Sequence, residues 1–343
     1  MNILVTGNLG YVGSILTEDL LNSGYNVVGL DYNYFKDCVF LDKKNNFKQI
    51  FRDIRKIEIN DLENIDAIIH LAGLSNDPLG DLDEKLTMDI NYKATVRLAD
   101  LAKKKKVKKF LYASTQSLYG ISNTDDEIKE DKAKINPLTA YAMSKWKSEN
   151  ELLLMSSDTF SVTILRPSTV FGFSPRLRCD IVFNNLMACA YTTNNVEILT
   201  DGSPWRPVLH VKDLSSGFKS LLSAPVNLIM SKVYNIGSHE GNFMVKDLAD
   251  IVQKKIKSSK ITYVNNHKDP RSYKVSFKKI FDELSNYYTP KFTLDYGADE
   301  LISFFKTVNF SIEDFRGHKT NRLKNLQKLL ISEKLDKNLV WIN

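Results

Sequence analysis

The chain begins with a short apolar segment followed by three glycines spaced by threes, in LVTGNLGYVGSIL (residues 4–16). The apolar segment reads as a buried strand, and YVGSILTEDLL carries apolar residues at helical spacing before Gly24, a residue type that often ends helices. The glycines therefore occupy the turn between a strand and a helix. In a dinucleotide-binding turn, Gly7 would permit the tight bend, Gly10 would let a pyrophosphate approach the backbone, and Gly13 would let the helix pack on the strand. On the glycines alone, an ordinary tight turn remains an alternative.

A carboxylate at the end of the second predicted strand favours the dinucleotide interpretation. Asp31 closes NVVGLD, where its side chain can accept hydrogen bonds from the hydroxyls of an adenosine ribose. The 2′-phosphate of NADP would meet a like charge at the same place. Asp31 therefore favours NAD over NADP.

Short apolar strands alternate with amphipathic helices up to about residue 166. The strands are NILVTG, NVVGLD, FKQIFRD, DAIIHLAG, KFLYAST and FSVTILRP, and the helices include a long segment that begins at DEKLTMD. This alternation predicts an α/β fold with a Rossmann-type doubly wound parallel sheet. We assign residues 1–166, with returning segments at about 205–238 that contain VLHV and VYNIG, to an NAD-binding domain. Residues 167–204 and 239–343 are assigned to a smaller C-terminal α/β substrate lobe with a helical tail.

Composition and charge argue against several other classes of protein. The 343 residues are 43% hydrophobic, enough for one large core or two linked ones. The densest run of positive charge, Lys103–Lys109, ends a predicted helix, where cations face the negative end of the helix dipole, so no nucleic-acid partner is expected. Cys38, Cys179 and Cys189 lack the spacing of a disulfide framework or a zinc site, and no metal is expected. With no signal segment and no apolar run of ~18 residues, we expect a cytoplasmic protein without a membrane partner.

Further motifs follow in a fixed order along the chain. They are the GxxGxxG spacing, DIR at Asp53–Arg55, HLAG at His70–Gly73, Asn91 in DINYKAT, and YAMSK with Tyr141 and Lys145. Together they resemble the extended short-chain dehydrogenases/reductases, specifically the NAD-dependent nucleotide-sugar epimerases and dehydratases such as the UDP-glucose 4-epimerase-like enzymes. The resemblance covers most of the chain. It implies that NAD is the cofactor and that it is bound by Gly7, Gly10, Tyr11, Val12, Gly13, Asp31, Asp53, Ile54, Leu71, Ala72, Gly73, Asn91, Tyr141 and Lys145.

Tyr141 and Lys145 are four residues apart, so on a helix they share a face. A phenol is a poor base at neutral pH, but a nearby ammonium group and a nicotinamide cation favour the phenolate. Tyr141 could then take the proton from a sugar hydroxyl while a hydride leaves the same carbon for NAD. The resemblance adds Thr115, in STQSLYG, as the hydroxyl residue that holds the reacting oxygen. An exposed helical pair is the alternative for the tyrosine and lysine taken alone.

The two positions after Thr115 bear on the type of reaction. Dehydratases of the resembled family carry an acidic pair there, whereas this chain has Gln116 and Ser117, which cannot act as general acid or base. We therefore expect C4 epimerisation through a 4-keto intermediate, in surface polysaccharide or glycan precursor synthesis. An NAD-dependent 4-dehydrogenase or 4-ketoreductase is the alternative. A non-catalytic NAD-binding regulatory protein is more remote, because such relatives typically lose the tyrosine or the lysine.

The second half of the chain supplies candidate contacts for a nucleotide-diphosphate sugar. RPSTVFG, NNL with Asn185, and Arg206 in DGSPWRPVLHV resemble family motifs, and a planar guanidinium suits two phosphoryl oxygens. Arg271 in DPRSYKVSF is a weaker candidate, and the loop SPRLR adds Arg176 and Arg178. The expected substrate-binding residues are Thr115, Gln116, Asn185, Arg206, Arg271 and Arg176. The resemblance also implies a homodimer, whereas the base and the sugar depend on loops whose shape the sequence does not give.

Overall fold

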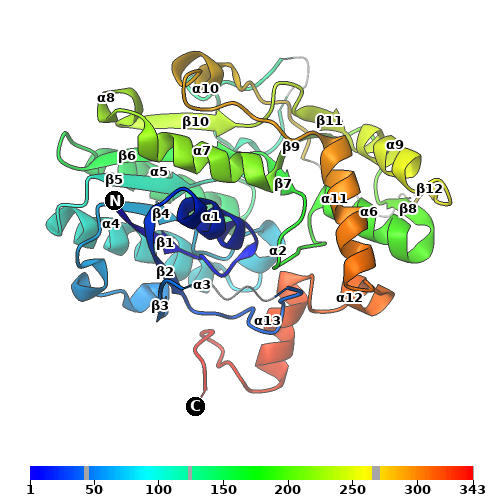
Figure 1. Ribbon diagram of the computed structural model, residues 1–343, viewed down its shortest axis with the longest axis horizontal. Helices are drawn as coiled ribbons and strands as arrows, with labels where there is room; N and C mark the ends of the chain where they lie inside the picture. Colours follow the sequence, from blue (N-terminus) through cyan, green and yellow to red (C-terminus); the bar gives the residue numbers. More distant parts are fainter. Residues whose placement is uncertain (42–45, 123–125, 265–270, 343) are drawn as a thin grey trace.

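A seven-stranded parallel sheet forms the centre of the protein, in the order β10-β6-β5-β4-β1-β2-β3 (Figure 1). The computed structural model describes residues 1–41, 46–122, 126–264 and 271–342. The strands of this sheet are β1 (Asn2–Thr6), β2 (Asn26–Asp31), β3 (Lys48–Phe51), β4 (Ala67–His70), β5 (Lys109–Ala113), β6 (Ser161–Pro167) and β10 (Lys232–Ile236). Every neighbouring pair in it is parallel. The predicted doubly wound sheet is confirmed, and the strand order reverses between β1 and β4, where such folds bind ligands.

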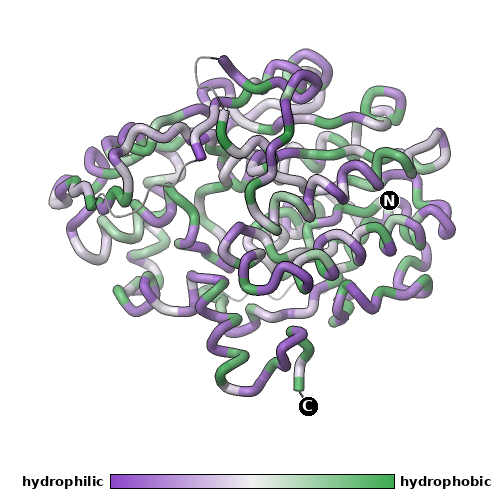
Figure 2. The backbone as a smooth tube through the Cα atoms, turned by 180° about the vertical axis from the view of Figure 1, so that it is seen from behind, coloured by the Kyte–Doolittle hydropathy of each residue, from purple (hydrophilic) through white to green (hydrophobic). Residues whose placement is uncertain are grey.

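Helices cover both faces of this sheet because the side chains of each strand alternate between the faces. Ile3 and Val5 of β1 belong to the same buried cluster as the apolar residues of two helices, α1 (Tyr11–Asn22) and α7 (Val211–Ser223). Leu4 points the other way and packs with α4 (Ala94–Lys104) and α5 (Ala140–Met155). Seen from behind, helices show green and purple stretches in turn, as amphipathic helices do (Figure 2).

The second half of the chain contributes one strand to the central sheet and builds two smaller sheets. VYNIG forms β10, which pairs with β6 as expected for a returning segment. The first three residues of VLHV lie in β9 (Trp205–His210), which pairs instead with β7 (Thr169–Phe171) and β11 (Asn242–Met244). Periodicity marked both segments as strands but did not specify their partners. The remaining sheet consists of β8 (Asn195–Ile198) and β12 (Lys260–Tyr263). The division into two lobes stays a prediction.

The long helical segment predicted from DEKLTMD onwards is interrupted in the structure. It consists of α3 (Glu84–Thr87), a π-helical segment η3 (Met88–Lys93), and α4. Such wide turns occur often at functional sites, and this one carries Asn91. The other short segments near the sheet are η1 (Ile54–Lys56), η2 (Ile59–Leu62), α2 (Asp77–Gly80), η4 (Gln116–Tyr119) and α8 (Val226–Ile229).

The C-terminal part of the chain is helical and returns to the central sheet. After β7 the chain forms the helices α6 (Val182–Thr193) and α9 (Val245–Lys255), followed by α10 (Lys278–Glu283), α11 (Leu294–Thr307), α12 (Ile312–Arg316) and α13 (Arg322–Ile331). In Figure 1, α13 lies at the bottom of the molecule, to the right of β2 and β3, and the chain ends nearby. None of the helices in the described ranges is long and apolar enough to cross a bilayer. Within the same ranges, no group of three or more His, Cys, Asp or Glu side chains could hold a metal ion.

Candidate active site

A cavity of about 880 Å³ lies at the carboxyl ends of the central strands and is also lined by residues of α6 and β9. It brings together residues that are far apart in the sequence and that belong to the predicted cofactor, catalytic and substrate sets. The predicted residues that line it are Gly7, Gly10, Tyr11, Val12, Gly13, Asp31, Asp53, Ile54, Leu71, Ala72, Gly73, Thr115, Gln116, Tyr141, Lys145, Asn185, Arg206 and Arg271. Two predicted residues, Asn91 and Arg176, do not line it.

The glycine turn at the start of α1 has the geometry of a phosphate cradle. Gly7 has a φ of +73°, a conformation that suits glycine, and a Cβ at Gly13 would lie 2.1 Å from the carbonyl oxygen of Gly7. Gly10 is the N-cap of α1, and no side chain caps the first turn of this helix. The N-terminal turn of α1 therefore lines the cavity with backbone amides that no side chain caps, an arrangement that suits a pyrophosphate. The residues present fit a dinucleotide.

Two carboxylates lie at the ends of β2 and β3. Asp31 accepts hydrogen bonds from the backbone amides of Leu9 (3.1 Å) and Asn33 (2.6 Å), and burial raises the pKa of its carboxyl group. Asp53, which the resemblance assigned to the adenine, forms an ion pair with Arg55 at 2.5 Å and also accepts its backbone amide. Asp53 therefore stabilises the turn at the cavity wall as well as lining the cavity.

Tyr141 and Lys145 lie on α5 and line the cavity together with Thr115, as their spacing predicted. Burial raises the pKa of the Tyr141 phenol, the charge of Asp77 raises it further, and a side-chain hydrogen bond with Thr115 lowers it. Burial lowers the pKa of the Lys145 ammonium group to about 7, against the opposing effect of Glu149. Lys145 donates a hydrogen bond to the carbonyl of Ala113 at 2.8 Å, at the end of β5.

Asn91 supports the site without lining it. Its side-chain oxygen accepts the amide of Leu74 (2.8 Å), and its nitrogen donates to the carbonyl of Leu74 (3.0 Å) and to the hydroxyl of Ser144 (3.2 Å). Asn91 thus links the loop after β4 to the helix that carries Tyr141. The resemblance implies that Asn91 supports the active site, and these bonds fit that role; its assignment to cofactor binding stays a prediction.

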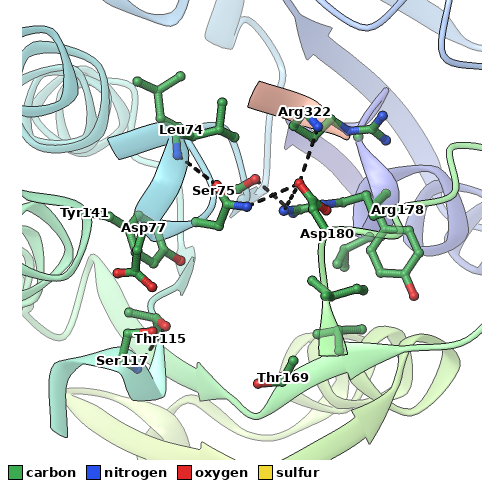
Figure 3. Close-up of a pocket in the computed structure, with 18 of the residues that line it drawn as sticks. Leu74, Ser75, Asp77, Thr115, Ser117, Tyr141, Thr169, Arg178, Asp180 and Arg322 are labelled. Carbon is green, nitrogen blue, oxygen red and sulfur yellow. Dashed lines mark hydrogen bonds and ion pairs between the residues drawn. The ribbon is translucent and has the colours of Figure 1, made fainter. Parts of the chain in front are cut away.

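Asp77 is a residue of this site that the sequence reasoning missed. It begins α2, lines the cavity, and lies beside Tyr141 and Thr115 (Figure 3). It accepts a hydrogen bond of 2.6 Å from Thr139, the N-cap of α5, and forms an ion pair with Arg271. The loop that follows a central strand is where such folds place functional residues, and this position could have indicated Asp77.

The arginines of the loop after β7 are arranged differently from the prediction. Arg176 donates to the carbonyl of Phe35 at 2.7 Å and does not line the cavity, whereas Arg178 lines it and donates to Asp180 and Ser75. Figure 3 shows Arg178 and Asp180 across the cavity from Tyr141. The two arginines therefore lie in different surroundings, and no periodicity in the loop signals which one faces inward.

The remaining substrate candidates line the cavity from two parts of the chain: Gln116 follows β5 of the central sheet, whereas Asn185 lies on α6 and Arg206 on β9. Arg206 donates to the carbonyls of Trp205 (2.9 Å) and Arg271 (2.5 Å), and Asn185 donates to the carbonyl of Cys179 (2.8 Å). The side-chain nitrogen of Gln116 donates to the carbonyl of Arg166 at 2.9 Å. These bonds fix the side chains at the cavity wall.

Comparison with known proteins identifies related chains. A family model described as the NAD dependent epimerase/dehydratase family matches residues 3–237. The UDP-glucuronate 4-epimerase of Thermodesulfobacterium geofontis (strain OPF15) is 27% identical over 332 residues, covering 91% of this chain and 96% of that protein. The UDP-glucuronic acid decarboxylase 1 of Arabidopsis thaliana is 26% identical over 331 residues, covering 92% of this chain and 72% of that protein.

Solved structures show the same architecture. The crystal structure of the UDP-glucuronic acid 4-epimerase from Bacillus cereus, in complex with UDP-glucuronic acid and NAD, matches with a TM-score of 0.78 at 26% identity. The match covers 90% of this chain and 100% of that chain.

Proposed function

This chain belongs to the NAD dependent epimerase/dehydratase family, and we propose that within this family it is a nucleotide-sugar 4-epimerase. The cofactor is NAD, as in the family and in the neighbouring structure. The observation that carries the proposal is one cavity lined by the glycine turn and by Thr115, Tyr141 and Lys145, with Gln116 in place of an acidic residue. The proposal extends to a role in surface polysaccharide or glycan precursor synthesis and to a homodimer.

In the proposed reaction, Tyr141 takes the proton of the sugar C4 hydroxyl as the C4 hydrogen leaves as a hydride. Bound NAD would accept this hydride and later return it to C4. Thr115 holds the reacting oxygen against the phenol, and the Lys145 ammonium group stabilises the phenolate. In the reverse step Tyr141 returns the proton to the oxygen of the 4-keto sugar. The 4-keto sugar must turn over in the cavity before this reverse step, so that the hydride would return to the opposite face of C4 and invert the configuration with no net oxidation.

The residues after Thr115 argue against a 4,6-dehydratase. Dehydration needs an acid to protonate the leaving hydroxyl and a base to take a proton from the neighbouring carbon. Gln116 is a neutral amide whose nitrogen is already bonded to a backbone carbonyl, and Ser117 is a neutral hydroxyl residue. A C4 oxidation and reduction needs neither group.

The experiment follows the fate of the C4 hydrogen with a panel of UDP-, GDP-, CDP- and dTDP-sugars, starting with UDP sugars because relatives are named for them. A 4-epimerase keeps deuterium from a C4-labelled substrate at C4 of the product. A dehydrogenase transfers the label to NADH and accumulates a 4-keto sugar, and a decarboxylase acting on a uronic acid releases CO₂. Either of these two results refutes the epimerase.

The Tyr141→Phe variant tests the assignment of the base. It removes one hydroxyl, so the protein should fold and bind NAD while turnover falls by roughly 10²- to 10⁴-fold. Tyr25→Phe is the matched control, since Tyr25 contacts Ser223 far along the chain and does not line the cavity. A fully active Tyr141→Phe variant would exclude Tyr141 as the base.

A further inference from the structure

The C-terminal segment, defined as residues 308–342, lies outside the residues matched by the family model and packs on the NAD-binding side of the protein. Leucines of α13 and of the residues after it are buried in the cluster that contains Leu30 of β2 and Ile54 of η1. The buried leucines of the segment are Leu326, Leu329, Leu335 and Leu339. The segment is therefore part of the core beneath the predicted adenosine end of the cavity.

Several hydrogen bonds connect this segment to the loop that follows Asp31. The Tyr34 hydroxyl donates to the carbonyl of Leu339 (2.7 Å), the Trp341 indole nitrogen donates to the carbonyl of Tyr32 (2.9 Å), and Asn325 donates to the carbonyl of Tyr34 (3.0 Å). Tyr32 and Tyr34 line the cavity. The C-terminal segment thus fixes the wall that presents Asp31 to a cofactor ribose.

Arg322, the first residue of α13, connects the same segment to the opposite wall. Its backbone amide donates to Asp180 at 3.3 Å, its guanidinium donates to the carbonyl of Arg176 at 2.6 Å, and the guanidinium lies 4.6 Å from the centre of the Phe35 ring. Figure 3 shows Arg322 next to Asp180 and Arg178 at the cavity wall. Arg322 is 2% exposed, so its contacts are shielded from water.

The two walls belong to different parts of the fold. One follows β2 of the central sheet, and the other follows β7 and leads into α6 of the smaller lobe. A dinucleotide bound at the adenosine end of the cavity would lie between these walls, and α13 together with Trp341 bonds to both of them. We propose that Arg322 and Trp341 are positioning residues of the cofactor site that hold these walls together and make bound NAD slow to dissociate. This inference rests on the proposed function. An epimerase must return the hydride that it has removed, so the same NAD has to stay bound through both half-reactions.

The test measures the dissociation of NAD from the purified 343-residue chain without any sugar present. Radiolabelled NAD is bound, an excess of unlabelled NAD is added, and retained label is followed on a filter for the wild type, Trp341→Ala and Arg322→Met. Each variant loses hydrogen bonds and packing, so we expect the dissociation rate to rise by about tenfold or more, which corresponds to ~1.4 kcal/mol. Ile331→Ala is the matched control, because Ile331 ends α13 and is 84% exposed.

Trp341→Phe separates an effect on NAD retention from an effect on folding stability, in case Trp341→Ala folds poorly. It keeps an aromatic ring but removes the bond to the Tyr32 carbonyl, so we expect a dissociation rate between those of the wild type and Trp341→Ala. Unchanged dissociation rates in variants whose melting temperature has fallen would overturn the proposal and make the segment purely structural. Because no sugar is used, this experiment can refute the role of Arg322 and Trp341 in NAD retention while the epimerase assignment stands. Equally, the epimerase assignment can fail in its own test while this role stands.

Discussion

Gly80 offers a sensitive test of how Tyr141, the proposed base, is placed, because α2 packs directly on the start of α5. A methyl group at position 80 would lie 2.7 Å from Cβ of Tyr141 and 3.0 Å from its backbone nitrogen. The nearest of these atoms is fixed to the backbone, and Thr139 and Asp77 already tie the two helices together by a hydrogen bond. Gly80→Ala must therefore displace the backbone of Tyr141 or of α2 rather than a flexible side chain.

The size of the effect follows from these distances. Favourable contacts between carbon atoms lie at about 3.5–4.0 Å, so the two helices must separate by about 1 Å. A misplacement of about 1 Å at a catalytic group can cost on the order of 10²-fold in rate. Forcing an extra methyl group into a packed contact costs about 1–3 kcal/mol of the free energy of unfolding. We expect Gly80→Ala to fold, with kcat reduced by about two orders of magnitude.

The assay combines steady-state kinetics with unfolding in urea and NAD binding, and its control is Gly24→Ala. Gly24 has a φ of +81° and open space where the methyl group of an alanine would lie, so alanine there costs about 1–2 kcal/mol through backbone strain without displacing the site. Gly24→Ala should lose stability and keep its kcat. Gly80→Ala should have a reduced kcat even under conditions in which all of the protein is folded. A Gly80→Ala variant with wild-type kcat would refute the reasoning, because Tyr141 would then tolerate the displacement.

Three further predictions concern cofactor choice, substrate binding and pH. Asp31→Ala should weaken NAD more than NADP in equilibrium binding, and an unchanged affinity ratio would place the ribose contact elsewhere. Arg206→Ala should raise KM more than it lowers kcat, because the diphosphate does not react; a normal KM with lost activity would assign Arg206 to the chemical step. Asp77→Asn removes a negative charge that raises the pKa of Tyr141. The rising limb of the pH–rate profile should therefore move to lower pH. A limb that stays in place or moves to higher pH would contradict the assignment of this limb to Tyr141.

The residues that were predictable from the sequence are those whose role depends on local spacing. Gly7 and Gly13 belong to one strand–turn–helix unit, and Tyr141 and Lys145 are one helical turn apart. Such units keep their geometry wherever they are placed, and a parallel sheet brings the carboxyl ends of its strands to one edge. The central sheet, the glycine turn and the position of the tyrosine–lysine pair in the cavity could therefore be anticipated.

Contacts between distant segments were not predictable in the same way. The tail reads as helical and charged, but its periodicity does not show that Trp341 reaches the loop after β2 or that Arg322 reaches Asp180. The choice between Arg176 and Arg178 depends on the conformation of a loop, and no repeating pattern specifies which side chain turns inward.

Arg271 shows how such a distant contact changes the meaning of a residue. Taken by itself, its guanidinium is a candidate for the substrate diphosphate, but in the structure it forms an ion pair with Asp77, which is 194 residues away in the sequence. A diphosphate that recruits Arg271 must compete with this carboxylate. Any release of Asp77 from Arg271 would also strengthen the negative charge beside Tyr141, and this links the diphosphate end of the cavity to the catalytic group.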